Sequence, residues 1–458
     1  DREKEGFLYL ITGLACMLIG FWGRRRKPKS SVFYSKEGFA AVALSWIILS
    51  LIGALPMYLT GEFPSYIDAL FETISGFTTT GSSILSDVET LSRGTAFWRC
   101  FTHWIGGMGV LVFIMAVMPL SDSSSMHLMR AESPGPAVGK LVPKVKTTAM
   151  ILYGIYVVFT VIEIIALLIA GMPLFDSMTL TFGTVGTGGF GLLNSSIASY
   201  STAVQIIITV FMIICSINFT VYYMFLIKRP KEALMCEEMR YYLLIVFGSA
   251  LLIAFNIRAS FASFGKAFQQ AIFQVASVIS TTGFATADFN LWPEFSRRIL
   301  VLLMFVGACA GSTGGGFKVS RLIIMVKSVR NEIMSVTHPR SVQKVHMDGR
   351  RIPDNVVKTV LCYLAGYVVI LIVSVLLISL DNFDMTTNFT AVMATFNNVG
   401  PGLNRVGPTG NFGGFSVLSK LVLMFDMLVG RLELYPMLVI FAPGLWRIHP
   451  HRHVGKVQ

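Results

Sequence analysis

Four short segments rich in threonine, glycine and asparagine carry the chemistry that this sequence suggests. Each follows an apolar stretch too short to cross a bilayer, and each has a long apolar stretch on either side. Their glycines lie roughly a hundred residues apart, a spacing that suits a repeated unit of helix, re-entrant loop and helix. The four segments are Thr78–Ser82, Thr187–Phe190, Ser280–Phe284 and Asn397–Pro401.

Segments of this composition can bind a dehydrated cation. Backbone carbonyl oxygens can replace the water around K⁺ without the tight grip of carboxylates, and glycine permits the backbone angles that aim successive carbonyls at one axis. The carboxyl end of each preceding short helix adds a partial negative charge. We therefore predict that the four loops meet and form a cation filter with K⁺ as the bound ion. Its predicted residues are Thr79, Thr80, Gly81, Ser82, Gly186, Thr187, Gly188, Gly189, Thr281, Thr282, Gly283, Phe284, Asn398, Val399, Gly400 and Pro401.

An ordinary turn between two helices is the alternative for any one of these loops. The recurrence of four such loops, each in register behind a short apolar segment, favours the filter. Within the second loop three glycines compete for the central position. We assign Gly188, because Thr187-Gly188 matches Thr80-Gly81 and Thr282-Gly283.

The composition places these loops in a membrane. The chain has 458 residues, of which 54% are hydrophobic and 14% are charged, and its mean hydropathy is +0.67. Soluble domains carry roughly 25% charged residues. We therefore expect an all-α polytopic membrane protein with four helix–pore loop–helix repeats around a central pore, plus one leading peripheral helix, rather than a soluble enzyme.

The net charge of +12 does not indicate a nucleic-acid surface. Basic residues gather in connections between apolar segments that fall on one side of the membrane if the loops are re-entrant, and the positive-inside rule makes that side cytoplasmic. We therefore expect a multi-pass protein of the plasma (inner) membrane. The basic clusters lie at residues 24–36, 130–146, 228–240, 327–358 and 447–456.

The repeats divide the chain into seven parts. We expect inner helices near residues 95–119, 201–227, 297–327 and 416–446. Because the sequence begins with Asp1 and not Met, we expect that residues precede it. The parts are a leading transmembrane helix with a basic linker (1–34), repeat 1 (35–120), a cytoplasmic linker (121–146), repeat 2 (147–228), repeat 3 with a broken inner helix (229–327), a second cytoplasmic linker (328–352), and repeat 4 with a cytoplasmic tail (353–458).

Two features interrupt the apolar inner segments. The run from Gly307 to Gly316 cannot form a stable helix, because each glycine costs roughly 1 kcal/mol relative to alanine. A structural kink would also explain this run. Arg431 lies in the middle of the last inner helix, where an unpaired arginine costs about 2.5–3.5 kcal/mol. It must face a cavity or a partner, so an electrostatic barrier below the filter and a structural salt bridge are both open.

The segments described so far resemble the filters of the Trk/Ktr/HKT superfamily of potassium transporters, and within it the TrkH branch. The resemblance extends to three further motifs and covers residues ~35–447, nearly the whole chain. One leading helix is counted where that branch has two. The further motifs are His103–Gly109, Ala310–Gly316 and Gly430–Glu433.

The resemblance implies specific roles. Glycine at all four filter centres, Gly81, Gly188, Gly283 and Gly400, suits the K⁺-selective members, whereas serine at the first marks Na⁺-preferring plant relatives. The glycine-rich run becomes an intramembrane gate, with Lys318 adding to the basic cytoplasmic side. The expected gate residues are Gly311, Ser312, Thr313, Gly314, Gly315, Gly316, Lys318 and Arg431.

The resemblance also implies partners and excludes others. We expect a homodimer in the lipid bilayer, one pore per subunit, and a separate TrkA-like RCK ring that binds nucleotide in the cytoplasm. The linkers 121–146 and 327–353 are either its docking surfaces or only topology signals. We expect no other cofactor and no nucleic acid. Gly186-x-Gly188-x-x-Gly191 fits a dinucleotide fingerprint but follows no β-strand, and Gly311–Lys318 departs from a phosphate-binding loop at Phe317.

The expected function is K⁺ uptake by a channel-like transporter driven by the membrane potential, with Na⁺- or H⁺-coupled K⁺ symport as the alternative. A membrane-embedded enzyme would need clustered acids, histidines or cysteines, and the chain has only scattered ones. His103 could relay protons, but we interpret it as a packed, hydrogen-bonded side chain. The scattered residues are Glu163, Asp426, Glu433 and His103.

Overall fold

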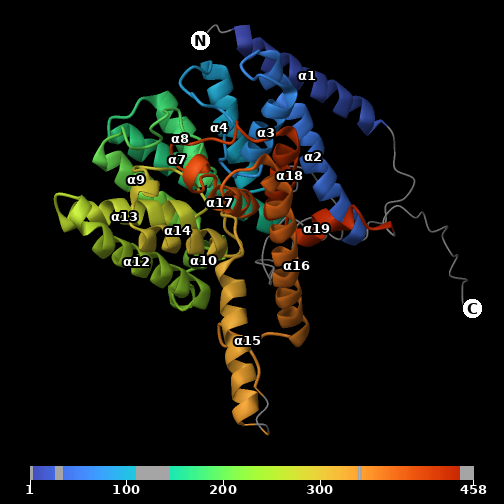
Figure 1. Cartoon of the computed structure of the whole chain (residues 1–458). Coiled ribbons are helices and arrows are strands. Elements are labelled where there is room, and N and C mark those ends of the chain that lie inside the picture. The colour runs from blue at the N-terminus through green and yellow to red at the C-terminus, as the bar shows by residue number, and fades with distance from the viewer. Residues whose placement is uncertain (1–3, 26–34, 110–144, 339, 341–342, 444–458) are drawn as a thin grey trace, which may run out of the picture.

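The computed structural model describes residues 4–25, 35–109, 145–338, 340 and 343–443. The expected all-helical membrane fold is confirmed. Across these ranges the chain forms helices and one small hairpin, in which β1 (His346–Met347) pairs with β2 (Arg350–Arg351). A leading helix, α1 (Lys4–Arg24), lies at the edge of the body and packs against α2 and α4 (Figure 1).

Four repeats of the same design follow α1. Each has a long outer helix, a short pore helix, a loop and an inner helix that returns. The first repeat contains α2 (Ser35–Leu59), α3 (Tyr66–Phe77) and α4 (Arg93–Gly107). The second contains α7 (Val145–Ile169), α8 (Leu174–Val185), α9 (Thr202–Cys215), α10 (Phe219–Leu226) and α11 (Pro230–Leu234). The third contains α12 (Glu237–Ile257), α13 (Phe264–Ile279), α14 (Glu294–Val306) and α15 (Val319–Thr337). The fourth contains α16 (Asp354–Ile378), α17 (Met385–Phe396), α18 (Val417–Leu432) and α19 (Leu434–Val439). Single 3-10 turns lie at Arg258–Ser260, Phe289–Leu291, Ser379–Asp381 and Asn404–Val406.

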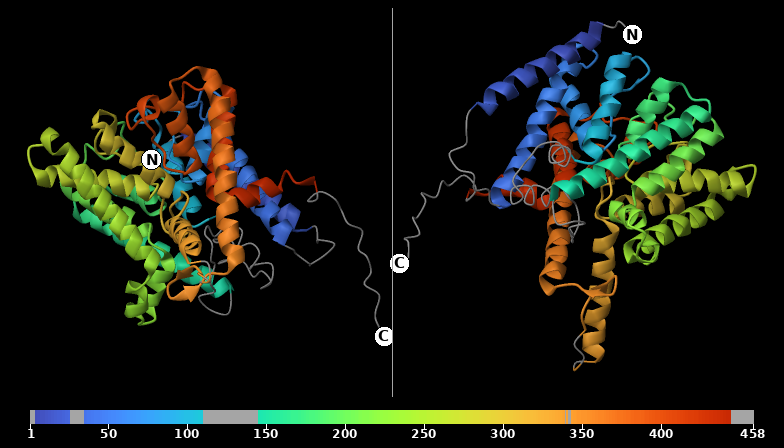
Figure 2. Two further views of the ribbon diagram at one scale, coloured as in Figure 1. Left: turned by 60° about the horizontal axis from the view of Figure 1, so that its bottom comes forward. Right: turned by 180° about the vertical axis from the view of Figure 1, so that it is seen from behind.

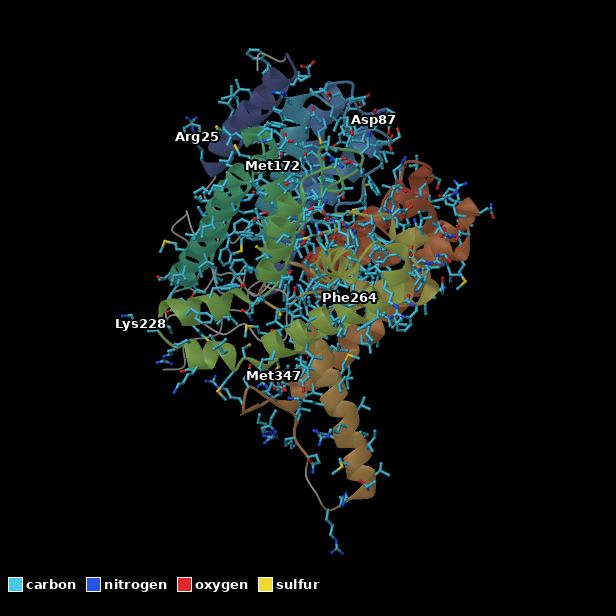
Figure 3. All side chains as sticks on the ribbon, turned by 90° about the vertical axis from the view of Figure 1, so that its left-hand side faces the viewer. Arg25, Asp87, Met172, Lys228, Phe264 and Met347 are labelled. Carbon is cyan, nitrogen blue, oxygen red and sulfur yellow. The ribbon has the colours of Figure 1, made fainter. Side chains whose placement is uncertain are left out.

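The outer helices and α1 have the length and hydropathy of membrane spans. Five stretches of the described chain meet that test, and a bent pair of helices makes a sixth. Their outward faces carry exposed apolar side chains such as Val158 and Ile165 on α7, and Val369 and Leu376 on α16. These side chains would be costly in water but suit lipid. Asp87 lies in the upper part of the body in Figure 3, whereas Lys228 lies lower and on the other side.

The pore helices are too short to cross the membrane. Three of them, α3, α8 and α17, have 12 residues each, which is about 18 Å or little more than half of a ~30 Å hydrocarbon core. Their last turns are buried, so after each of these helices the chain must turn back inside the protein. Each pore helix also packs against the inner helix of the preceding repeat: α8 on α4, α13 on α9, α17 on α14 and α3 on α18. This packing joins the four repeats in cyclic order.

The inner helices are more broken than the sequence predicts. The second was expected to run unbroken from 201 to 227, but α9 and α10 meet at 88°. Backbone groups at this break bond to the glycine-rich run instead of to the helix: Cys309 N–H donates to Ser216 O at 3.1 Å, and Phe219 N–H donates to Gly311 O at 3.0 Å. The fourth, expected at 416–446, breaks at Glu433, whose φ is +67°. The first ends at Gly107, and residues 110–119 of its expected range lie outside the described residues.

The second linker also has more structure than expected. The helix α15 continues to Thr337, within the range predicted to be linker, and projects from the body (Figures 1 and 2). After it, the hairpin β1–β2 turns at Asp348 and Gly349, both with positive φ. An Asp-Gly pair is a strong signal for such a two-residue turn.

Asp384 caps the pore helix α17, and its loss is expected to destabilise the fold. Its carboxylate accepts hydrogen bonds from Thr387 N–H at 3.0 Å and from Asn404 Nδ2 at 2.9 Å. Partial burial alone would raise the pKa of Asp384, but the hydrogen bond from the Thr387 hydroxyl, together with these two, outweighs it, and the pKa lies below its ordinary value of 3.8. The stabilisation is therefore present above that value and is lost as pH falls through the lowered pKa. Asp384→Ala should cost about 1 kcal/mol of unfolding free energy, seen as a lower Tm in detergent, whereas Asp384→Ser should retain most of the cap.

Candidate functional site

The four predicted loops share one backbone conformation, which begins where each pore helix ends. In each loop the first residue is left-handed, and the next donates its N–H to the carbonyl five residues earlier, at 2.7–2.9 Å. The third residue is a glycine with positive φ. The left-handed residues are Thr79, Thr187, Thr281 and Asn398, with φ of 54°, 55°, 61° and 54°. The donors are Thr80, Gly188, Thr282 and Val399, which bond to Ser75, Gly183, Ser277 and Ala394. The glycines are Gly81, Gly189, Gly283 and Gly400, with φ of 79°, 81°, 85° and 99°.

This repeat corrects the register predicted for the second loop. Gly189, not Gly188, has the conformation of the other central glycines, because the Gly188 N–H bonds to Gly183 O as Thr80 N–H bonds to Ser75 O. Gly186 ends α8 at the position of Thr78, so the loop that matches Thr79–Ser82 is Thr187–Phe190. A glycine is still required at 188, since any side chain there would overlap the ring of His103.

The loops touch one another in cyclic order. A methyl group on Gly81 would overlap the Gly188 carbonyl oxygen. The same holds for Gly189 against the Thr282 oxygen and for Gly283 against the Val399 oxygen. A methyl group on Gly400 would lie 2.8 Å from the Thr80 oxygen. Loops 4 and 1 are also joined directly, because Ser82 Oγ donates to Gly400 O and Asn398 Nδ2 donates to Thr80 Oγ1, both at 2.9 Å. The structure therefore brings the four central glycines to one place, with carbonyl oxygens packed between neighbouring loops.

A cavity of about 150 Å³ opens on one side of this ring. All four loops contribute to its wall, which is formed mainly by backbone, hydroxyl and amide groups. Such a surface can solvate an ion without binding it tightly. The polar side chains in this wall include Ser82, Ser83, Ser86, Asn194, Ser196, Thr409 and Asn411, together with Arg99.

The glycine-rich run lies against the other side of loops 3 and 4. Gly315 N–H donates to Thr281 Oγ1 at 2.6 Å, and side chains on Gly314 or Gly315 would crowd the carbonyl oxygens of Ser280 and Asn397. Thr313 Oγ1 bonds to Cys215 O at 3.1 Å, and Ser312 Oγ bonds to Cys309 O at 2.6 Å. Side-chain and backbone hydrogen bonds therefore hold the run from Gly307 to Gly316 in place, and we call it the plug-like segment.

Lys318 does not add to the basic cytoplasmic surface, so that expectation is wrong. Its side chain is buried, and its Nζ donates to Gly314 O within the same run. Lys318 also has a φ of +86°, which ends the run and begins α15. It therefore stabilises the plug-like segment from within.

Arg431 connects this segment to the first repeat. Its Nη1 donates to Thr313 O at 2.7 Å, and its Nη2 donates to the carbonyl oxygens of Gly106 and Gly107 at the end of α4. Glu433 pairs instead with Arg321, at 2.5 Å. A cavity of about 10 Å³, roughly one water in size, lies beside Arg431, Lys318 and the glycines. A hydrated ion does not fit there.

His103 supports the loops from behind, and its interpretation as a satisfied, packed side chain is confirmed. Its Nδ1 lies 2.7 Å from Gly76 O, and its Nε2 accepts from Phe190 N–H at 3.2 Å. These partners require the neutral tautomer with the proton on Nδ1. Within the described residues, no three His, Cys, Asp or Glu side chains are grouped to hold a metal ion.

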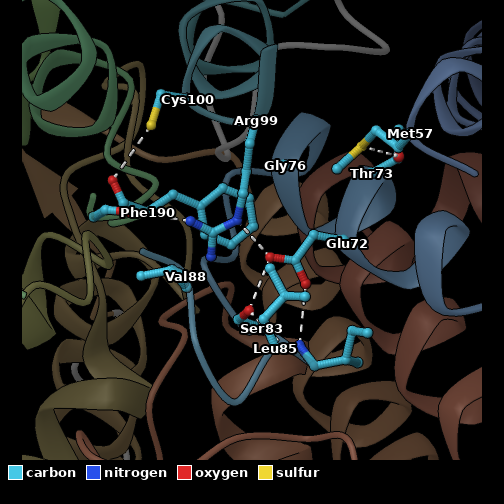
Figure 4. Close-up of polar contacts among 12 residues, drawn as sticks. Met57, Glu72, Thr73, Gly76, Ser83, Leu85, Val88, Arg99, Cys100 and Phe190 are labelled. Atoms are coloured by element: carbon cyan, nitrogen blue, oxygen red, sulfur yellow. Dashed lines mark hydrogen bonds and ion pairs between the residues drawn. The ribbon is translucent and has the colours of Figure 1, made fainter. Parts of the chain in front are cut away.

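Glu72 and Arg99, which no sequence pattern above singles out, also lie behind the loops. They form a buried ion pair between α3 and α4 at 2.5 Å (Figure 4). A charged residue within an apolar helix was the available signal, since such residues at membrane depth mark functional sites.

The chain is similar to known proteins over nearly its full length. The family model described as "TrkH: Cation transport protein" matches residues 9–448. The Trk system potassium uptake protein TrkH of Salmonella typhimurium is 35% identical over 97% of this chain and 93% of its own, and the protein TrkG of Escherichia coli is 31% identical over 97% and 93%. The crystal structure of the potassium transporter TrkH from Vibrio parahaemolyticus matches with a TM-score of 0.87 at 32% identity, covering 97% and 93% of the two chains.

Proposed function

This chain belongs to the TrkH family of cation transport proteins, and from that membership we propose that it takes up K⁺ through a channel-like pathway. It is a multi-pass membrane protein. The relatives named above are potassium uptake proteins, and the driving force here would be the membrane potential. Selection would take place where the four loops meet, with backbone carbonyls in place of the ion's water.

One observation supports this proposal above the others. Four loops from distant parts of the chain repeat the same sequence of backbone angles and contact each other in a ring. A helix-to-helix turn has no reason to keep that conformation four times, or to pack four glycines with positive φ against neighbouring carbonyls. An ion site that is lined by backbone oxygens does require this repeated conformation and this packing. The carbonyls of Thr80, Gly188, Thr282 and Val399 would be among its ligands.

The plug-like segment would be the gate. It lies on the opposite side of the loops from the large cavity, and the space beside Arg431 holds about one water. Arg431 would both hold the segment and oppose a cation in the pathway. Opening would therefore require the segment to leave its contacts with Thr281, Cys215 and Arg431.

The protein would work with partners in the inner membrane. Its basic connections would face the cytoplasm, and two copies would associate, each with its own pore. A TrkA-like RCK ring would bind nucleotide and act on the gate through the linkers. Of these, 121–146 lies mostly outside the described residues, whereas 328–352 includes the end of α15 and the hairpin β1–β2.

Ion flux in proteoliposomes tests the function. We expect K⁺ flux well above Na⁺ flux at equal gradients, and flux that continues without a Na⁺ or proton gradient. In Gly81→Ser, the added side chain would press on the Gly188 carbonyl. The K⁺:Na⁺ flux ratio should then fall about tenfold, or about 1.4 kcal/mol in relative barrier height.

A K⁺ flux that stops when the Na⁺ or proton gradient is removed would favour coupled symport on the same fold. The absence of any K⁺ flux from correctly folded protein, both in the wild type and in Arg431→Ala, would contradict the proposed function.

A further inference from the structure

Glu72 and Arg99 form an ion pair in the interior behind the first two loops. Their side chains are 0% and 4% exposed, and Arg99 Nε lies 2.5 Å from Glu72 Oε1. Burying two charges is costly unless their remaining hydrogen-bonding groups are also satisfied. The partners that satisfy them are therefore informative.

The remaining bonds of Glu72 go to the first loop. Its Oε1 accepts from Ser83 Oγ at 2.9 Å, and its Oε2 accepts from Ile84 N–H at 3.0 Å. Ser83 and Ile84 directly follow Gly81 and Ser82. Because Glu72 lies on α3, its bonds connect the carboxyl-terminal end of loop 1 to the pore helix that precedes this loop (Figure 4).

The remaining contacts of Arg99 go to the second loop. Its Nη1 donates to Gly191 O at 3.1 Å, and its guanidinium carbon lies 3.6 Å from the centre of the Phe190 ring. Cys100, the next residue of α4, lies with its Sγ 3.7 Å from Phe190 O. Phe190 and Gly191 directly follow Gly189, so Arg99 holds loop 2 at the same level at which Glu72 holds loop 1.

We propose that the Glu72–Arg99 pair is a positioning clamp that sets the spacing between loops 1 and 2 and thereby contributes to K⁺ selectivity. This inference rests on the proposed function. Carbonyl ligands select an ion by their number and distance, so a clamp that fixes two of four loops affects the preference for K⁺ over Na⁺. Arg99 also lines the large cavity, and Glu72 neutralises it where a cation would enter.

The chain offers a matched control on the same pore helix. Asp68 of α3 pairs with Lys420 of α18 at 2.6 Å, and the two side chains are 12% and 11% exposed. The other side-chain bond of Asp68 comes from Ser65, at the start of α3. Asp68→Asn therefore leaves a largely buried cation without its partner, as Glu72→Gln does, but at a site away from the loops.

The test measures K⁺ and Na⁺ flux in proteoliposomes together with Tm in detergent. Glu72→Gln should lower the K⁺:Na⁺ flux ratio about tenfold, and Ser83→Ala, which keeps the ion pair but cuts one link to loop 1, about threefold. Glu72→Met/Arg99→Met leaves no unpaired charge, so its Tm should approach that of the wild type while its ratio stays low. Asp68→Asn should lower Tm but keep the wild-type ratio.

Two outcomes would overturn the clamp: a wild-type ratio in both Glu72→Met/Arg99→Met and Ser83→Ala, or an equal loss of ratio in Asp68→Asn. Either result would leave the proposed function standing if the wild type carries K⁺ selectively. Failure of the proposed function is distinct, because neither the wild type nor Arg431→Ala would then carry K⁺.

Discussion

Gly283→Ala is expected to lower K⁺ flux by more than about 100-fold. Gly283 has a φ of +85°, a conformation that costs an L-residue roughly 1–2 kcal/mol. More importantly, its new methyl group would overlap the Val399 carbonyl oxygen and lie 2.9 Å from Pro401 Cδ. The third loop or its neighbour would have to move, and a carbonyl misplaced by a fraction of an ångström no longer serves as an ion ligand. Flux of K⁺ or Rb⁺ into vesicles gives the measurement.

Gly171 provides the control for backbone strain. It has nearly the same φ, +88°, but its new side chain would meet no atom within 4 Å. In Gly171→Ala, backbone strain alone should therefore lower Tm, and K⁺ flux should stay within about twofold of wild type. Equal flux in Gly283→Ala and Gly171→Ala would show that loop 3 does not lie on the ion pathway.

Arg431→Ala is expected to raise K⁺ flux about 100-fold in vesicles that hold this chain alone. The substitution removes the guanidinium bonds to Thr313 O and to the end of α4, which together hold the plug-like segment. Hydrogen bonds to charged groups contribute about 1.5–3 kcal/mol each. If the closed state loses about 2.8 kcal/mol of stability relative to the open state, the ratio of open to closed molecules rises 100-fold. The rise should saturate once the segment is open in most molecules.

Arg298 supplies a matched arginine that the gate does not use. It pairs with Glu294 one turn away on the surface of α14, and an exposed pair of this kind contributes little. Arg298→Ala should therefore leave flux unchanged. Unaltered flux in Arg431→Ala would contradict the gate assignment, whereas a loss of flux with normal Tm would indicate that Arg431 holds the pathway open instead.

Composition and spacing were sufficient to locate the loops but not to set the register of every one. The sequence Thr-Thr-Gly places Gly81 and Gly283 without ambiguity. In Gly186-Thr187-Gly188-Gly189, however, the residue types leave three candidates. The choice is made by a hydrogen bond, from Gly188 N–H to Gly183 O, that depends on where α8 ends. Helix ends are set by capping and packing, which a sequence pattern fixes only within a few residues.

The breaks in the inner helices were missed for a different reason. Residues 216–218 contain neither glycine nor proline, and the one local signal there is Asn218, which caps α10 by accepting from Thr220 N–H at 2.8 Å but does not predict an 88° bend. The bend exists because Ser216 and Phe219 exchange backbone hydrogen bonds with a segment almost a hundred residues later in the chain. The Glu72–Arg99 pair is similar, since its two halves lie on different helices and neither spacing nor periodicity connects them. Tertiary contacts decided both features.

The ring of loops is built from a single polypeptide, and its first, second and last seams are chemically unlike. An ion pair supports the first seam, and Ile197 N–H with Ala285 O, at 3.0 Å, supports the second. Asn398 and Ser82 join the last. In a channel assembled from identical chains, a point mutation strikes all four quadrants at once. Here a point mutation changes only one of the four loops, so selectivity can be adjusted through one loop at a time. A loop that tolerates substitutions can diverge while the other three continue to hold the ion.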